Sequence, residues 1–273
     1  MQSLSDLLKN FFTHKDFLPP AHEIAGTLFT PLHIIFAIIV LAAVILSAIL
    51  LSKKNERTIR TVFAVIWIVL CILEVTKIAW ETLSGKSVSF EWGGILPLYP
   101  CSIFLYALPF AIWGKGKVRY AACGYVCSLG FIGGAVNFVY PANILSNYSC
   151  ISFSGFHTFL FHGAIVFATL VMLISGYHKY NQIHHFCELL LPSAPFLIVS
   201  VIANLVNFSK IDSDYMFFKL ESFIFAPIGA ATADWLSVII VYVTYLILHA
   251  LPYIPFYIKS KIKHTQQSKY LSN

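Results

Sequence analysis

Residues 31–51 read PLHIIFAIIVLAAVILSAILL, and His33 is the one ionisable side chain among them. A run of about 20 apolar residues suffices for a helix to cross the roughly 30 Å hydrocarbon core of a bilayer, at about 1.5 Å per residue. Six further apolar runs follow along the chain. They occupy residues 61–80, 96–113, 119–140, 156–176, 187–207 and 235–258. The sequence therefore predicts an all-α, polytopic membrane protein with seven transmembrane helices.

The composition favours the same fold class. Of the 273 residues, 58% are hydrophobic and 11% are charged, whereas an ordinary soluble domain carries about 25% charged residues. Soluble nucleic-acid binders and disordered chains are excluded by this balance, and six Cys are too few for a disulfide framework. The first 20 residues lack the apolar core and cleavage site of a signal peptide, so we expect the first spanning helix to direct insertion.

The basic residues predict the orientation in the membrane. Twelve of the 18 Lys and Arg fall in residues 52–60, 114–119, 177–186 and 259–273, which share one side of a seven-helix layout. Five fall on the other side. The positive-inside rule then places the N-terminus outside and the C-terminus in the cytoplasm, as expected for a multi-pass protein of the plasma membrane.

The chain predicts one domain. No repeat or low-complexity segment divides residues 1–273, so we expect a single seven-helix membrane domain. Residues 3–14 carry Leu and Phe at helical spacing, which predicts an amphipathic helix on the outer interface. Residues 259–273 predict a basic cytoplasmic tail.

Polar side chains inside the apolar runs gather toward the predicted outer side. Ionisable groups in hydrocarbon are costly, so each one is a candidate for a functional site. By helical rise, Glu74 lies about 9 Å below Trp80, and His162 lies about 9 Å from Phe156. The remaining members of the set are His33, Lys77, Cys101, Asn137, Tyr140, His157, Asn204, Asn207 and Asp234. An outward-facing polar cavity is the simplest arrangement for such a set.

Two structural explanations compete with a functional one. Helix ends tolerate polar groups, so His33, Lys77 and His157 are also explained as interfacial residues. Glu74 and Lys77 are spaced i,i+3 and can pair on one helix face, which favours a structural role for Lys77. Glu74 and His162 lie deeper, as does Asn204, and for these a shared cavity is the better explanation.

Cys101 follows Pro97 and Pro100, where the pattern predicts a helix start inside a run that prolines interrupt. The first N–H groups of a helix have no intrahelical partner. A thiol at this end is favoured as a reactive thiolate, and the N–H groups of Ser102 and Ile103 are candidates to receive an oxyanion.

A nucleophilic Cys101 also needs a base. His162 lies at a similar depth, and a Cys–His pair is the minimum set for covalent acyl transfer. Glu74 or Asn204 is the candidate to orient the imidazole. Two alternatives stay open from the residues alone, since a buried Cys usually only packs, and Cys101 can also form a disulfide with Cys150.

These residues resemble a family of integral membrane proteins that joins the YwaF-like bacterial proteins with eukaryotic transmembrane protein 164. The resemblance runs along most of the chain. It is carried by Phe29-Thr30-Pro31-Leu32-His33, Glu74, the Leu-Pro-Leu-x-x-Cys motif ending at Cys101, Phe161-His162-Gly163, and Asn204 followed by Asp214-Tyr215-Met216-Phe217. Bacterial members more often have His at the position of Tyr99 and an apolar residue at that of Pro100.

The resemblance implies an acyltransferase that moves fatty acyl chains between membrane phospholipids through an acyl-cysteine. Cys101 and His162 match the catalytic pair of the family, and more distant relatives are lipid hydrolases with a Thr–His pair. A transporter or solute-binding protein is the rival hypothesis, in which Glu74, His162 and Asn204 bind the substrate and Cys101 packs.

We predict no cofactor and no metal. His178, His184, His185, Cys187 and Glu188 cluster in sequence, but their spacing matches no strong metal-site pattern. The expected partners are membrane phospholipids and not nucleic acid.

Overall fold

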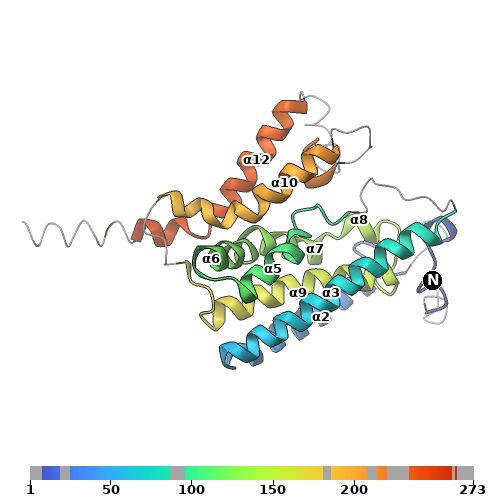
Figure 1. Ribbon diagram of the computed structural model, residues 1–273. Coiled ribbons are helices and arrows are strands. Elements are labelled where there is room, and N and C mark those ends of the chain that lie inside the picture. Colours follow the sequence, from blue (N-terminus) through green and yellow to red (C-terminus); the bar gives the residue numbers. More distant parts are fainter. Residues whose placement is uncertain are drawn as a thin grey trace, which may run out of the picture. The chain divides into compact units, whose positions relative to one another are not determined.

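The computed structural model describes residues 8–18, 25–86, 96–180, 186–207, 214–219, 234–259 and 262. All regular secondary structure in these ranges is helical (Figure 1). Five helical segments are long and apolar enough to cross a membrane: Pro31–Ser52, Glu56–Ser84, Gly116–Leu145, Phe153–Ile174 and Glu188–Asn207. The shorter apolar helices Ile103–Trp113 and Trp235–Ala250 lie within the third and seventh predicted runs. The all-α membrane class is confirmed, while the count of seven spans and the orientation stay predictions.

The first two long helices begin at side-chain caps. Helix α2 (Pro31–Ser52) has Thr30 as its N-cap, whose side chain accepts the His33 N–H, and it starts with Pro at its first position. Helix α3 (Glu56–Ser84) is capped by the Asn55 side chain, which accepts the Thr58 N–H at 2.9 Å. Such caps satisfy N–H groups that a helix leaves unpaired. The cap at Asn55 explains why α3 begins five residues before the predicted run.

The described residues form two compact units, each assembled from separate stretches of the chain. Unit 1 takes its residues from Met1–Pro97 and Phe131–Val171. Unit 2 takes its residues from Leu98–Gly130, Met172–Lys210 and Asp214–Asn273. A single seven-helix membrane domain stays a prediction.

Unit 1 contains α2, α3, α7 (Phe131–Val139), α8 (Ala142–Leu145) and most of α9 (Phe153–Ile174). In Figure 1, α2 and α3 run alongside α9. Phe138, Phe159 and Val166 form the core of this unit, and apolar side chains of α2 pack against it. The opposite faces of α2 and α3 leave Ile, Leu and Val side chains exposed, as expected for helices that contact lipid.

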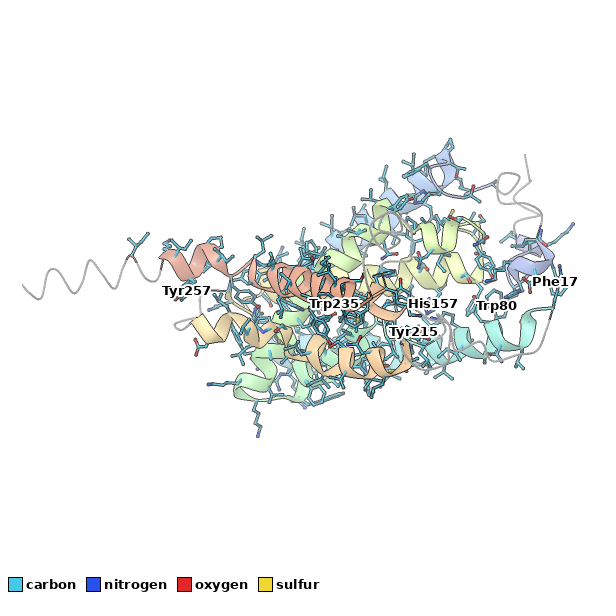
Figure 2. The ribbon with its side chains drawn as sticks, turned by 90° about the horizontal axis from the view of Figure 1, so that it is seen from above. Phe17, Trp80, His157, Tyr215, Trp235 and Tyr257 are labelled. Atoms are coloured by element: carbon cyan, nitrogen blue, oxygen red, sulfur yellow. The ribbon has the colours of Figure 1, made fainter. Side chains whose placement is uncertain are left out.

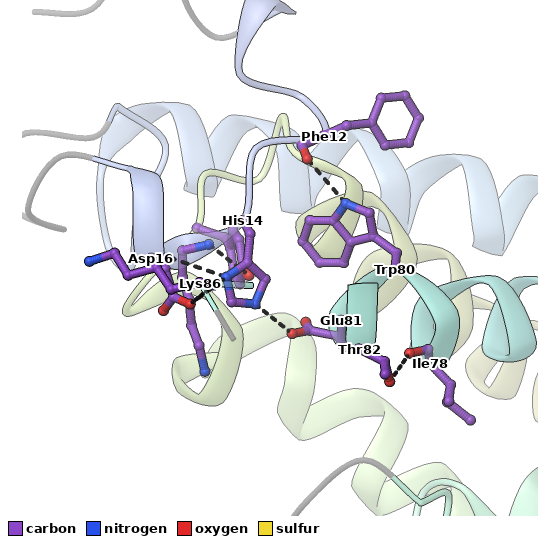
Figure 3. Close-up of polar contacts among 10 residues, drawn as sticks. Phe12, His14, Asp16, Ile78, Trp80, Glu81, Thr82 and Lys86 are labelled. Atoms are coloured by element: carbon purple, nitrogen blue, oxygen red, sulfur yellow. Dashed lines mark hydrogen bonds and ion pairs between the residues drawn. The ribbon is translucent and has the colours of Figure 1, made fainter. Parts of the chain in front are cut away.

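The N-terminal segment packs on the end of α3 (Figure 3). Leu8 and Lys9 are helical, but the chain turns at residues 10–12, so the predicted helix over 3–14 is wrong beyond Lys9; residues 3–7 lie outside the described ranges. The turn is held by tertiary contacts that the helical spacing does not encode. The Trp80 indole N–H donates to the Phe12 carbonyl at 3.1 Å, and His14 Nε2 lies 3.2 Å from Glu81.

Unit 2 contains α5 (Ile103–Trp113), α6 (Gly116–Tyr125), η5 (Phe186–Ser193), α10 (Ala194–Asn207), η6 (Tyr215–Phe217) and α12 (Asp234–Ala250). Helix α6 contacts α5, η5 and α10. Directly after α6, a π-helical turn, η3 (Val126–Gly130), is buried throughout. Such turns insert one extra residue into a helix and often occur at functional sites.

The third apolar run is interrupted, as its prolines predict. Residues 96–102 form no helix, and α5 starts at Ile103 and contains Pro109. With 11 residues, α5 is about 16 Å long, roughly half the thickness of the hydrocarbon core. Cys101 therefore lies in a turn that precedes α5 and not within it.

Candidate functional site

His162 lies on α9 in unit 1 with one ring nitrogen fixed. Its Nδ1 is 2.8 Å from the carbonyl oxygen of Thr158, one turn earlier in the same helix. Because a carbonyl only accepts hydrogen bonds, Nδ1 carries the proton, and the neutral ring keeps its lone pair on Nε2. That Nε2 is buried and has no hydrogen-bond partner among the described residues. The His162 ring is therefore oriented as a base, with Nε2 as the atom that would accept a proton.

An ion cluster on α3 and α9 lies near this base. Glu74 is buried, its Oε1 accepts from Lys77 Nζ at 2.5 Å, and its Oε2 lies 3.1 Å from His157 Nε2. The contact with His157 has the distance of an ion pair but not the angle of a hydrogen bond. Glu74, Lys77 and His157 all interact electrostatically with His162. In Figure 2 the labelled residues Phe17, Trp80 and His157 follow one another from the right-hand edge toward the centre of the view.

The predicted pairing of Glu74 with Lys77 is thus confirmed, whereas the predicted orientation of His162 is wrong. The Thr158 carbonyl, and not the Glu74 carboxylate, binds Nδ1 and so orients the imidazole. A polar side chain on a helix can form a hydrogen bond with the backbone carbonyl four residues earlier. The spacing of Thr158 and His162 was therefore the feature of the sequence that indicated this contact.

His33 and Asn137 have local partners in unit 1. His33 Nδ1 accepts the Phe29 backbone N–H at 3.1 Å, while Thr30 accepts the His33 N–H at 3.3 Å. This reciprocal arrangement fixes the start of α2 in the manner of a capping box, with Phe29 held at a positive φ of 61°. Asn137 donates to the carbonyl of Gly133 on its own helix at 2.9 Å.

Cys101 lies in unit 2, half-buried, in a hydrogen-bonded turn. The N–H groups of Ser102 and Ile103 donate to the Tyr99 carbonyl at 2.9 and 3.3 Å. The prediction that these two groups are free to receive an oxyanion is therefore wrong. An ideal helix start leaves its first N–H groups unpaired, whereas here the Tyr99 carbonyl accepts hydrogen bonds from both.

Aromatic side chains of unit 2 surround this turn. Tyr99 packs its ring against Tyr215 and Phe217, with both centroid distances at 5.3 Å. The Tyr125 hydroxyl donates to the Pro100 carbonyl through a short hydrogen bond. Tyr125 also interacts electrostatically with Cys101. Sequence reasoning missed Tyr125, whose position among apolar residues gave no signal.

The turn that carries Tyr215 is held in an uncommon backbone conformation. Met216 and Phe217 have φ values of 60° and 59°, which cost L-residues free energy and persist only where the surroundings hold them. Asn207 holds both backbone polar groups of Tyr215, each at 2.7 Å, and Tyr245 donates to the Met216 carbonyl at 3.1 Å. Asn207 thus has a structural role beside the Cys101 turn.

Asn204 lies one helical turn before Asn207 on α10. Its Nδ2 donates to the Tyr242 hydroxyl at 3.0 Å, and its Oδ1 has no hydrogen-bond partner among the described residues. Asn204, Asn207 and Cys101 all belong to unit 2. His33, Glu74, Lys77, Asn137, His157 and His162 all belong to unit 1.

Among the cysteines whose side chains the structure describes, Cys150 and Cys101 form no disulfide. Cys150 is fully buried in the loop after α8, and burial raises the pKa of its thiol to about 11. It is therefore protonated at neutral pH. Within the described ranges, no group of three or more His, Cys, Asp and Glu is placed to hold a metal ion.

Comparison with protein families identifies a family for this chain. The model of the TMEM164 family matches residues 28–260, which is most of the chain and includes every candidate site residue named above. Searches of curated proteins and of solved structures found no significant match.

Proposed function

The chain belongs to the TMEM164 family, and from this membership and the state of His162 we propose that it is an acyltransferase of the membrane. It moves fatty acyl chains between phospholipids through a thioester on Cys101. The observation that carries the proposal is the His162 ring, because its free, buried Nε2 lone pair is what the proton transfers of such a reaction require.

The reaction balances with these two groups. His162 Nε2 takes the thiol proton as Cys101 Sγ attacks the ester carbonyl of the donor lipid, and the leaving lysolipid oxygen receives that proton. In the second half, the hydroxyl of an acceptor lysolipid gives its proton to Nε2 as its oxygen attacks the thioester. The carbon–sulfur bond breaks, and the proton returns to Sγ.

The supporting residues divide by role in this proposal. Glu74 stabilises the imidazolium that forms when His162 takes a proton, since a carboxylate nearby favours the charged ring. Lys77 and His157 pair with Glu74 and so hold the carboxylate in place. Asn207 holds the turn beside Cys101. His33 fixes the start of α2, and Asn137 and Asn204 line the outward-facing polar cavity that we propose.

We further propose a multi-pass protein of the plasma membrane with seven spans and its N-terminus outside. The exposed apolar faces of α2 and α3 support lipid contact along unit 1. A phospholipid substrate is already dissolved in the bilayer and can enter between helices, so the enzyme needs no aqueous entry route for acyl chains.

The test is intact-mass analysis of purified protein incubated with phospholipid. Wild type is expected to carry a hydroxylamine-labile acyl adduct that Cys101→Ala abolishes and His162→Ala slows. Cys71→Ala is the matched control, because Cys71 is also a half-buried thiol and should leave the adduct unchanged.

An adduct that persists in Cys101→Ala would disprove the thioester route. Unchanged lipid remodelling in Cys101→Ala, without any adduct on wild type, would favour a transporter or binding protein. Release of free fatty acid without transfer to a lysolipid would instead indicate a hydrolase.

A further inference from the structure

Unit 2 also contains a buried histidine that has no part in the proposed reaction. His249, near the end of α12, has no exposed surface, and its Nδ1 lies 2.9 Å from Ser128 Oγ on the π-helical turn η3. Ser128 is 1% exposed and sits 2.7 Å from the Gly124 carbonyl. Two buried polar side chains from distant parts of the sequence thus meet at the one irregular turn of the α6–α7 segment.

The contacts assign the protons of this pair. The Gly124 carbonyl can only accept, so the Ser128 hydroxyl donates to it, and His249 Nδ1–H must then donate to Ser128 Oγ. The serine proton therefore points away from the histidine. This arrangement does not suit a serine nucleophile, which would donate its proton to the ring.

The same histidine reaches the Cys101 turn through one aromatic side chain. The His249 ring lies 5.2 Å from the Tyr125 ring, centroid to centroid. The Tyr125 hydroxyl in turn donates to the Pro100 carbonyl, which belongs to the peptide bond between Pro100 and Cys101. That peptide unit is planar, so a hydrogen bond to its oxygen limits the rotation that directs the Cys101 side chain.

We propose that Ser128, His249 and Tyr125 form a positioning chain that fixes the Pro100–Cys101 peptide and thereby the direction of Cys101 Sγ. The proposal rests on the proposed function in that Cys101 is the reacting group. Tyr125 is the positioning residue in contact with the turn. His249 holds the Tyr125 ring, and Ser128 holds His249.

The experiment follows alkylation of each cysteine by a small maleimide in the purified full-length protein, resolved by peptide mass spectrometry. Tyr125→Phe keeps the ring and removes the hydroxyl. We expect alkylation of half-buried Cys101 to become about fivefold faster, the factor that the net loss of one hydrogen bond carries, and acyl-adduct formation to slow. Ser128→Ala is expected to change both rates in the same direction by a smaller factor.

Tyr180→Phe is the matched control, since Tyr180 also donates its hydroxyl to a backbone carbonyl in unit 2, that of Cys127, at 2.7 Å. It should leave Cys101 unchanged. Buried Cys123 and Cys127 report general loosening of unit 2 and should stay unreactive in Tyr125→Phe.

The proposal is overturned if Cys101 alkylation in Tyr125→Phe equals that of wild type. It is also overturned if Tyr180→Phe has the same effect, or if Cys123 and Cys127 become reactive in parallel. Alkylation needs no acyl donor, so a failure of the acyltransferase proposal leaves this readout intact and distinguishable.

Discussion

His162 and His249 are two histidines that the chain holds in one tautomer by a similar device. In each, Nδ1–H donates to an oxygen fixed by a helix, Thr158 O or Ser128 Oγ, and Nε2 is left without a partner among the described residues. A buried polar atom without a partner costs free energy, so natural structures rarely keep one without a functional reason. The difference lies in their neighbours, because acidic Glu74 interacts with His162, whereas aromatic rings surround His249.

Glu74→Gln is the residue-scale prediction. The substitution leaves Lys77 and His157 without their carboxylate, and removal of one partner of a buried ion pair costs about 3 kcal/mol. We expect a lower midpoint of thermal unfolding in detergent. Glu56→Gln is the control on the same helix, because its ion pair with Arg60 is solvent-exposed and contributes about 0.5 kcal/mol. Equal midpoints for the two variants would show that the cluster does not stabilise unit 1.

At the scale of elements, the apolar runs predicted where helices lie but not how their ends are held. The predicted run 31–51 matches α2 to within one residue, because Thr30 and Pro31 are residues that favour a helix start. The Glu74–Lys77 pair was also predictable, since both residues lie on one helix at a spacing of three. Local spacing carries such features.

Contacts between elements were not predictable in the same way. Three such features depend on tertiary packing or on turn geometry. They are the turn at residues 10–12, the hydrogen bonds from the Ser102 and Ile103 N–H groups to the Tyr99 carbonyl, and the contacts of Asn207 with Tyr215. The sequence did not indicate the contact of His249 with Ser128, because the two residues are 121 positions apart. A hydrophobicity pattern does not report on pairs at that distance.

The approach of α7 to α9 gives the element-scale prediction. A Cβ added at Gly134 would lie 3.2 Å from two Ile165 carbons and 3.3 Å from the His162 carbonyl, whereas one added at Gly163 would meet Val44 at an ordinary 3.4 Å. Gly134→Ala should therefore lower the thermal midpoint relative to Gly163→Ala, which gains up to about 1 kcal/mol of helix propensity. Thermal unfolding of both variants in detergent decides this, and a higher midpoint for Gly134→Ala would contradict it.

At the scale of the whole molecule, the orientation in the bilayer is open to a direct test. Lys54 lies in the basic connection between α2 and α3, and Lys86 lies just beyond the other end of α3. The positive-inside rule predicts that Lys54 faces the cytoplasm and Lys86 the outside. A membrane-impermeant maleimide applied to intact cells should label Lys86→Cys and spare Lys54→Cys until the cells are opened. The reverse pattern would invert the topology.

The spacing of the Glu74 contacts also bears on how the protein is made. Lys77 is on the same helix, one turn away, so its ion pair with Glu74 forms as soon as α3 coils. His157 lies on α9, which is synthesised after α3. Lys77 thus neutralises the Glu74 carboxylate before α9 is synthesised. This ion pair lowers the free-energy cost of moving α3 into lipid. The histidine then adds to a carboxylate whose cost of insertion Lys77 has already reduced.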